Sequence, residues 1–233
     1  MSVLSPLLLS LEVAAIATLC TFCIGLGLAH RSTRLRAGRR QTLWGIFECI
    51  ILMPMVFPPT ITGYLLLLLL GPKGPFGSIL ATLGIEILFT WGAAVIASAV
   101  VSLPLLYQAC KGALLSVEPQ YAAAARTLGL SERRIFWRVT FPLAWPGILG
   151  GIALAFARAL GEFGATLMVA GNIPGYTQTL PIALYSAVES GRQETANIIL
   201  AIMLVFSLLI MLIVRRCERR VQERRLARTG GAP

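Results

Sequence analysis

Five long apolar runs dominate this sequence and constrain its fold more than any other feature. Each has the roughly 20 residues that a helix needs to cross the hydrocarbon core of a bilayer. They cover residues 7–29, 43–70, 79–106, 143–170 and 196–214. Every backbone polar group inside a bilayer must be satisfied within the protein, so such runs form helices. The sequence therefore predicts an all-α, polytopic membrane protein with about five transmembrane helices in one domain, residues 7–214.

The positive charges predict how these helices are oriented. The chain carries 20 Lys and Arg, and 17 of them lie in three segments, at 30–41, 111–138 and 215–228. These segments alternate with nearly charge-free loops at 71–78 and 171–195, which is the pattern of cytoplasmic and external loops. We therefore predict an external N-terminus and a basic cytoplasmic tail at the C-terminus, residues 215–233.

Several function classes are disfavoured by residues that the sequence lacks. No basic patch is interleaved with stacking aromatics, so the net charge of +10 does not predict nucleic-acid binding. Cys20 and Cys23 have the spacing of a metal or redox pair, but His30 is the single histidine and there is no second pair, so no metal site is expected. No Gly-x-x-x-x-Gly-Lys-Ser/Thr loop is present, so the chain is not expected to hydrolyse ATP or to hold a cofactor.

The polar segment at residues 116–142 begins with the signature of a short helix. Ser116 is predicted to cap this helix, and Glu118 and Pro119 are predicted to lie in its first turn. Alanines follow, and they favour helix propagation. Gly129 is predicted to end the helix in the left-handed conformation.

A second short helix is predicted directly after this bend. Ser131 is expected to cap it, and Pro142 is expected to end the polar segment. Small residues at a bend let another protein approach the backbone closely, so the segment predicts a docking elbow between two spans. The alternative is an amphipathic cytoplasmic loop with no special role.

The second apolar run contains a predicted break. Pro58 and Pro59 remove two backbone donors, and the hydroxyls of Thr60 and Thr62 lie beside them. Such a break at membrane depth is tolerated where it is buried in protein or lines a water-filled cavity. We interpret these residues as lining a pathway; a kink that only serves packing remains the alternative.

The fourth apolar run contains two charged residues, Arg158 and Glu162, four positions apart and so expected on one helical face. Charges at this depth are costly and usually mark function. Arg158 is predicted to attract an anion and Glu162 to moderate that attraction. The alternative is an ion pair that only neutralises itself.

The elbow resembles the cytoplasmic loop of the permeases of binding-protein-dependent ABC importers. That loop reads Glu-Ala-Ala, three residues, Gly, nine residues, Ile-x-Leu-Pro, and the pattern falls here on residues 123–125, 129 and 139–142. Ala123 stands where the family has Glu. The resemblance implies the type I importer permease fold, location in the bacterial inner membrane, and contact with a cytoplasmic ATPase through Glu118, Ala123, Ala124, Ala125, Arg126, Gly129 and Pro142.

Two further stretches, residues 57–63 and 161–185, resemble those of molybdate permeases. This resemblance implies a homodimer that forms one pathway for molybdate or tungstate. It also implies two partners, an external oxyanion-binding protein and an ATPase dimer that carries the ATP and Mg²⁺. Sulfate or thiosulfate is the alternative substrate within the family. The alternative from another class is an intramembrane enzyme centred on Arg158 and Glu162.

Overall fold

The computed structural model describes the backbone of residues 3–34 and 39–229; the side chains of 39–40, 217–218 and 220–229 lie outside the description. The described residues form helices joined by loops, without a β-strand among them, as predicted. The helices, in chain order, are α1 (Leu4–Arg34), α2 (Arg39–Val56), α3 (Pro59–Leu70), α4 (Pro75–Thr82), α5 (Trp91–Leu115), α6 (Pro119–Thr127), α7 (Glu132–Ile135), the π-helix η1 (Phe136–Thr140), α8 (Phe141–Leu160), α9 (Gly164–Ala170), α10 (Leu180–Glu189) and α11 (Gln193–Thr229).

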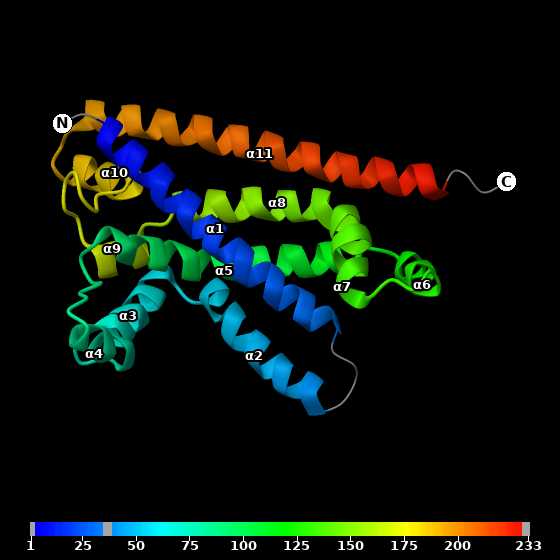
Figure 1. Ribbon diagram of the computed structural model, residues 1–233. Coiled ribbons are helices and arrows are strands. Elements are labelled where there is room, and N and C mark those ends of the chain that lie inside the picture. The colour runs from blue at the N-terminus through cyan, green and yellow to red at the C-terminus, as the bar shows by residue number, and fades with distance from the viewer. Residues whose placement is uncertain (1–2, 35–38, 230–233) are drawn as a thin grey trace.

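Helices α1, α5 and α8 form the centre of the molecule, and small residues let them pack closely. A Cβ added at Gly151 of α8 would lie 2.5 Å from the Cβ of Ala109 on α5, and one added at Gly147 would lie 2.9 Å from that of Ala113. Dispersion contacts between small residues stabilise helix pairs in lipid, where the hydrophobic effect gives no drive for association. Around this centre, α11 runs along one side and α2, α3 and α4 lie on the opposite side (Figure 1).

The two ends of the molecule differ in what they carry (Figure 1). One end holds α6, α7 and the C-terminal part of α11, together with the last turn of α1. The other end holds the N-terminus with α4, α9 and α10. The described parts of the three cation-rich segments therefore lie toward the same end, which we call the elbow end.

Four helical segments among the described residues are long and apolar enough to cross a bilayer: Leu4–Arg34, Trp91–Leu115, Glu132–Leu160 and Gln193–Arg216. The pair α3 and α4, bent by 43°, provides a fifth when it is counted as one broken span. The prediction of an all-α polytopic protein with about five spans is confirmed at this level.

The predicted boundaries of the second and third spans are wrong. The run 43–70 is divided between α2 and α3 at the predicted break, where residues 57 and 58 leave the helix. The run 79–106 is not one helix, because α4 ends at Thr82 and α5 begins only at Trp91. Residues with positive φ, Gly84 at +71° and Phe89 at +59°, interrupt the apolar segment between them.

The fourth and fifth predicted spans also need correction. The run 143–170 consists of α8 and α9, separated by residues 161–163. The run 196–214 lies inside α11, which continues to Thr229 through most of the predicted tail. Residues 230–233 of that tail lie outside the described residues.

Candidate functional site

The N-cap of the first elbow helix, α6, lies two residues later than predicted. Ser116 lies at the C-cap of α5, and its hydroxyl donates to the carbonyl of Ala113. Glu118 occupies the N-cap position of α6 in extended conformation, followed by Pro119 at the first helical position, where a proline loses no helical hydrogen bond. The bend has the predicted conformation, since Gly129 has φ +75°.

The elbow exposes some of the predicted coupling residues and hides one. Ala123, Ala124 and Arg126 are exposed, whereas Ala125 is only 5% exposed and packs inward. Leu128, which the sequence analysis missed, is 80% exposed beside the bend. This apolar side chain is therefore accessible at the tip of the elbow. Its signal in the sequence is one leucine between a polar helix end and Gly129.

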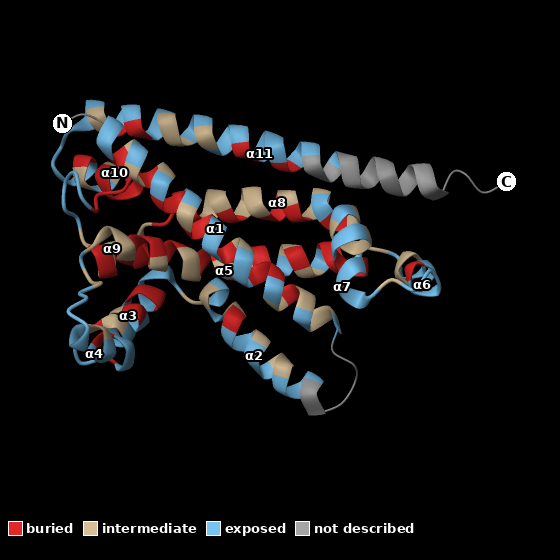
Figure 2. Ribbon diagram, viewed as in Figure 1, coloured by how far each residue is buried: buried red, intermediate tan, exposed pale blue. Residues whose placement is uncertain are grey.

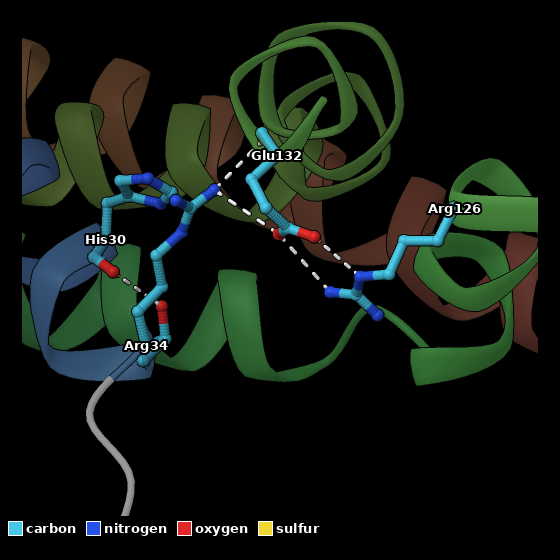
Figure 3. Close-up of polar contacts among 5 residues, drawn as sticks. His30, Arg34, Arg126 and Glu132 are labelled. Carbon is cyan, nitrogen blue, oxygen red and sulfur yellow. Dashed lines mark hydrogen bonds and ion pairs between the residues drawn. The ribbon is translucent and has the colours of Figure 1, made fainter. Parts of the chain in front are cut away.

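Glu132 joins three segments at the elbow end (Figure 3). Its carboxylate accepts two hydrogen bonds from Arg126, from Nε at 2.6 Å and from Nη2 at 3.3 Å. Its backbone carbonyl accepts a hydrogen bond of 3.0 Å from Nη2 of Arg34, at the end of α1. The hydrogen bond to Glu132 raises the pKa of the Arg126 guanidinium. The two short elbow helices and α1 are thus tied together at one residue that the sequence analysis did not single out.

The second elbow helix was predicted to be short, but it continues past Pro142. Helix α7 continues through the π-helix η1 into α8, and Pro142 lies near the start of α8, directly after the π-helix. Ser131 holds the predicted N-cap position but makes no side-chain capping hydrogen bond. The continuous segment Glu132–Leu160 is 29 residues long, which corresponds to about 40 Å of helix. The second elbow helix and Arg158 therefore lie on one uninterrupted helical segment.

The two predicted pathway segments meet where α3 packs on α9. A Cβ added at Gly63 would lie 2.7 Å from the Cα of Ala165 and 2.9 Å from the Cβ of Met168. One added at Gly164 would lie 3.1 Å from the Cβ of Pro59. The break after α2 and the break after α8 therefore form one joint, in which glycine is needed because backbones approach closely.

The predicted pathway residues of α3 differ in exposure. Pro58, Pro59 and Thr60 are exposed in the protomer, whereas Thr62 is buried, with 4% exposure. Thr62 therefore contributes to the packing of the joint in this structure, and Thr60 presents its side chain at the surface.

Arg158 and Glu162 form an ion pair, with Nη1 of Arg158 2.7 Å from Oε2 of Glu162. The prediction that they share one helical face is wrong, because Arg158 lies in the last turn of α8 and Glu162 lies after the helix end. The other carboxylate oxygen of Glu162 accepts a hydrogen bond of 2.8 Å from the backbone N–H of Ala165, at the start of α9. The carboxylate side chain is 1% exposed and the arginine side chain 34%. The pair thus presents its cation and hides its anion.

A second ion pair within the bundle was missed. Lys111 of α5 donates to Glu48 of α2, and the ammonium lies 5.8 Å from the ring centroid of Tyr107. Glu48 interrupts a predicted span, which is the signal that the sequence offered. The contact ties α2 to the centre of the bundle.

Exposed residues follow α2, α3 and α11 (Figure 2). Many of them are apolar, including Ile46 of α2 at 60% exposure, Leu68 of α3 at 49% and Leu208 of α11 at 63%. Such surfaces suit lipid or another membrane chain. Within the part of the chain that the structure describes, no group of three or more His, Cys, Asp or Glu is placed to hold a metal ion.

The fold, the elbow and the joint beside Arg158 together define a multi-pass membrane subunit of a transport system. The chain belongs to the family of binding-protein-dependent transport system inner membrane components, whose model matches residues 22–223. It is 38% identical over 213 residues to the putative molybdenum transport system permease protein YvgM of Bacillus subtilis, covering 91% of this chain and 92% of the relative. It is also 38% identical over 222 residues to the molybdenum transport system permease protein ModB of Escherichia coli K12, covering 95% of each.

Solved structures share the fold. A chain of the MetNI methionine ABC transporter in an inward-facing conformation superposes with a TM-score of 0.71 at 19% identity, covering 96% of this chain and 99% of that chain. A chain of a bacterial alginate ABC transporter in complex with its periplasmic protein gives a TM-score of 0.72 at 17% identity, covering 94% and 78%. The predicted importer permease fold is confirmed.

Proposed function

We propose that this chain is the permease subunit of an ABC importer for molybdate or tungstate. Two copies form one pathway, an external binding protein delivers the oxyanion, and a separate ATPase, which carries ATP and Mg²⁺, drives the cycle. The observation that carries the proposal is the 38% identity to molybdenum permeases over nearly the whole chain. The N-terminus lies outside and the elbow end lies in the cytoplasm, in keeping with the positive charge gathered there.

The elbow is the docking site for the ATPase. Ala123 and Ala124 offer a small, closely approachable surface, and Leu128 offers an apolar anchor. Ala123 replaces the family's glutamate, so Glu118 and Glu132 are the remaining elbow carboxylates. Because α7, η1 and α8 are continuous, movement of the docked ATPase is transmitted along α8 toward Arg158.

Arg158 serves the anion in this proposal. A dianion that crosses a low-dielectric layer needs positive charge or oriented donors, and the Arg158 side chain is one-third exposed. Glu162 neutralises the arginine in the resting state and keeps the site from holding the anion too strongly, because transport requires release. Thr60 adds a hydroxyl from α3 beside the joint.

Paired substitutions at Arg158 and Glu162 separate this role from a structural one. Arg158→Gln leaves a buried carboxylate without its cation, which costs about 3–5 kcal/mol. Adding Glu162→Gln removes that cost, so the double variant is expected to recover stability. If Arg158 serves the anion, uptake of molybdate at equal membrane abundance is lost in both variants. Recovery of uptake in the double variant would contradict the role in transport.

Association with an ATPase tests the general assignment. The chain is expressed in its host, extracted from the membrane and purified in detergent. It is expected to co-purify with an ABC ATPase. Leu128→Glu, on the exposed tip of the elbow, is expected to abolish co-purification while the chain still inserts. The control is Arg216→Gln, an exposed substitution toward the elbow end. Leu204→Glu would not serve as a control, because it places a charge in a span. An unaltered complex in the Leu128 variant would contradict docking at the elbow.

A further inference from the structure

The start of the fourth span carries a stripe of aromatic rings, exposed at Trp137 and Trp145 and half-buried at Phe141, with arginines at one end. Trp137, Phe141 and Trp145 follow each other at intervals of four residues, with ring centroids 5.2 Å and 5.3 Å apart. Trp137 is 52% exposed and Trp145 39% exposed. Arg134 and Arg138, on either side of Trp137 in sequence, are exposed as well. None of this is needed for docking at α6 or for the joint near Arg158.

The two arginines carry charge that the protomer leaves unneutralised. Among the described residues, the carboxylate nearest in sequence, Glu132, is engaged by Arg126 and Arg34, and no ion pair involves Arg134 or Arg138. The underside of the stripe is fixed, since Phe136 is buried against His30 with ring centroids 3.8 Å apart. The stripe is therefore a firm, outward-facing surface with positive charge at one end and apolar rings along the rest.

We propose that this stripe binds an anionic phospholipid of the cytoplasmic leaflet, with the headgroup at Arg134 and Arg138 and an acyl chain along the rings of Trp137, Phe141 and Trp145. Tryptophan prefers the membrane interface, and basic residues next to a span attract anionic lipids. The inference rests on the proposed orientation of the elbow end and goes beyond the proposed transport function.

A lipid fits this surface better than a protein partner does. Trp145 lies about 12 Å further along the helix than Trp137 and within the predicted span, so a cytoplasmic ATPase that covers the arginines does not extend over the whole stripe. A second copy of the chain would bring the same positive charges against themselves, which disfavours association. A phospholipid has the matching arrangement of one anionic end and one apolar end.

Quenching of Trp137 fluorescence by brominated lipids tests the proposal. The full-length chain carries Trp44→Phe, Trp91→Phe and Trp145→Phe, so that Trp137 is the single reporter, and it is reconstituted in nanodiscs of phosphatidylcholine. One quarter of the lipid is then brominated phosphatidylglycerol or, for comparison, brominated phosphatidylcholine. Phosphatidylglycerol is expected to quench several-fold more strongly, and added salt is expected to reduce the preference.

Substitution of the arginines distinguishes a headgroup site from general membrane contact. Neutralising both arginines removes the local positive charge that attracts the anionic headgroup, so Arg134→Gln with Arg138→Gln is expected to bring the two lipids close to equal quenching. The matched control, Arg215→Gln with Arg216→Gln, removes the same charge from exposed positions of α11 and is expected to keep the preference.

Three results would overturn the proposal. The first is equal quenching by the two brominated lipids in the unsubstituted reporter chain. The second is a preference that survives loss of Arg134 and Arg138. The third is loss of the quenching when the ATPase binds, with quenching measured as the difference in Trp137 fluorescence between brominated and unbrominated lipid. That result would assign the surface to the ATPase.

Discussion

The joint between α3 and α9 gives a stability prediction whose size follows from the structure. Gly63→Ala would place a Cβ 2.7 Å from the Cα of Ala165, and the neighbouring atom is backbone, which cannot rotate away. The two helices must separate by about 1 Å to restore ordinary contact, and overpacking of this kind costs about 1–3 kcal/mol. Against this, alanine favours a helix over glycine by about 1 kcal/mol.

A matched glycine isolates the cost of the clash. Gly27 lies in α1, and a Cβ added there meets no atom within 4 Å. Gly27→Ala therefore gains the helix preference without the clash, and the two variants are expected to differ by about 1–3 kcal/mol. With roughly 2–4 °C of melting temperature for each kcal/mol, thermal unfolding in detergent resolves this difference. Equal melting temperatures for the two variants would refute the close approach of α3 and α9.

Three further predictions concern the elbow and the orientation of the chain. Gly129→Val puts a branched side chain at φ +75°, which strains the backbone by about 1–3 kcal/mol, so uptake and transport-coupled ATP hydrolysis are expected to fall. Gly129→Asn, which tolerates this conformation, is expected to retain most activity. Normal uptake by the valine variant would reject the bend. Glu132→Gln weakens the contact with Arg126, so coupling is expected to fall with little change in melting temperature, and unchanged coupling would count against the link. In a background without the five native cysteines, cysteines near Gly74 and Gly175, at the exposed positions Lys73 and Tyr176, are expected to react with an external impermeant reagent. One at Ser32 is not expected to react, and the reverse pattern would invert the proposed orientation.

The sequence predicted the elements that local chemistry determines. Gly129 was identified as a left-handed bend because a glycine follows an alanine-rich helix, and this conformation depends little on tertiary contacts. The break at Pro58 was predicted because proline removes a backbone donor wherever it lies. Apolar composition likewise predicted a helical membrane protein.

The span boundaries could not be read from composition, because apolar loops and apolar helices look alike. Residues 83–90 are mostly apolar, yet the chain turns there, and the N–H of Phe89 donates to the carbonyl of Val169 at 2.8 Å. That contact joins segments 80 residues apart in sequence, so only the folded structure defines it. One local signal was available: Thr90 caps α5 by accepting a hydrogen bond from the N–H of Ala93.

The charged pair illustrates the same limit within the site. The spacing of Arg158 and Glu162 predicted an ion pair, and they form one. It did not predict that the helix ends between them, since Glu162 is fixed by the N–H of Ala165 after the turn. The difference in exposure between the two side chains, on which the proposed role of Arg158 depends, follows from that turn.

Uptake by a reconstituted system tests the central claim most directly. The chain is placed in proteoliposomes with its ATPase and the external binding protein, and molybdate accumulation is measured with ATP in the compartment of the ATPase, with sulfate as competitor. The account predicts ATP-dependent molybdate uptake that requires all three components and that excess sulfate inhibits weakly. Uptake that proceeds without the ATPase, or a system that accumulates sulfate and not molybdate, would contradict it.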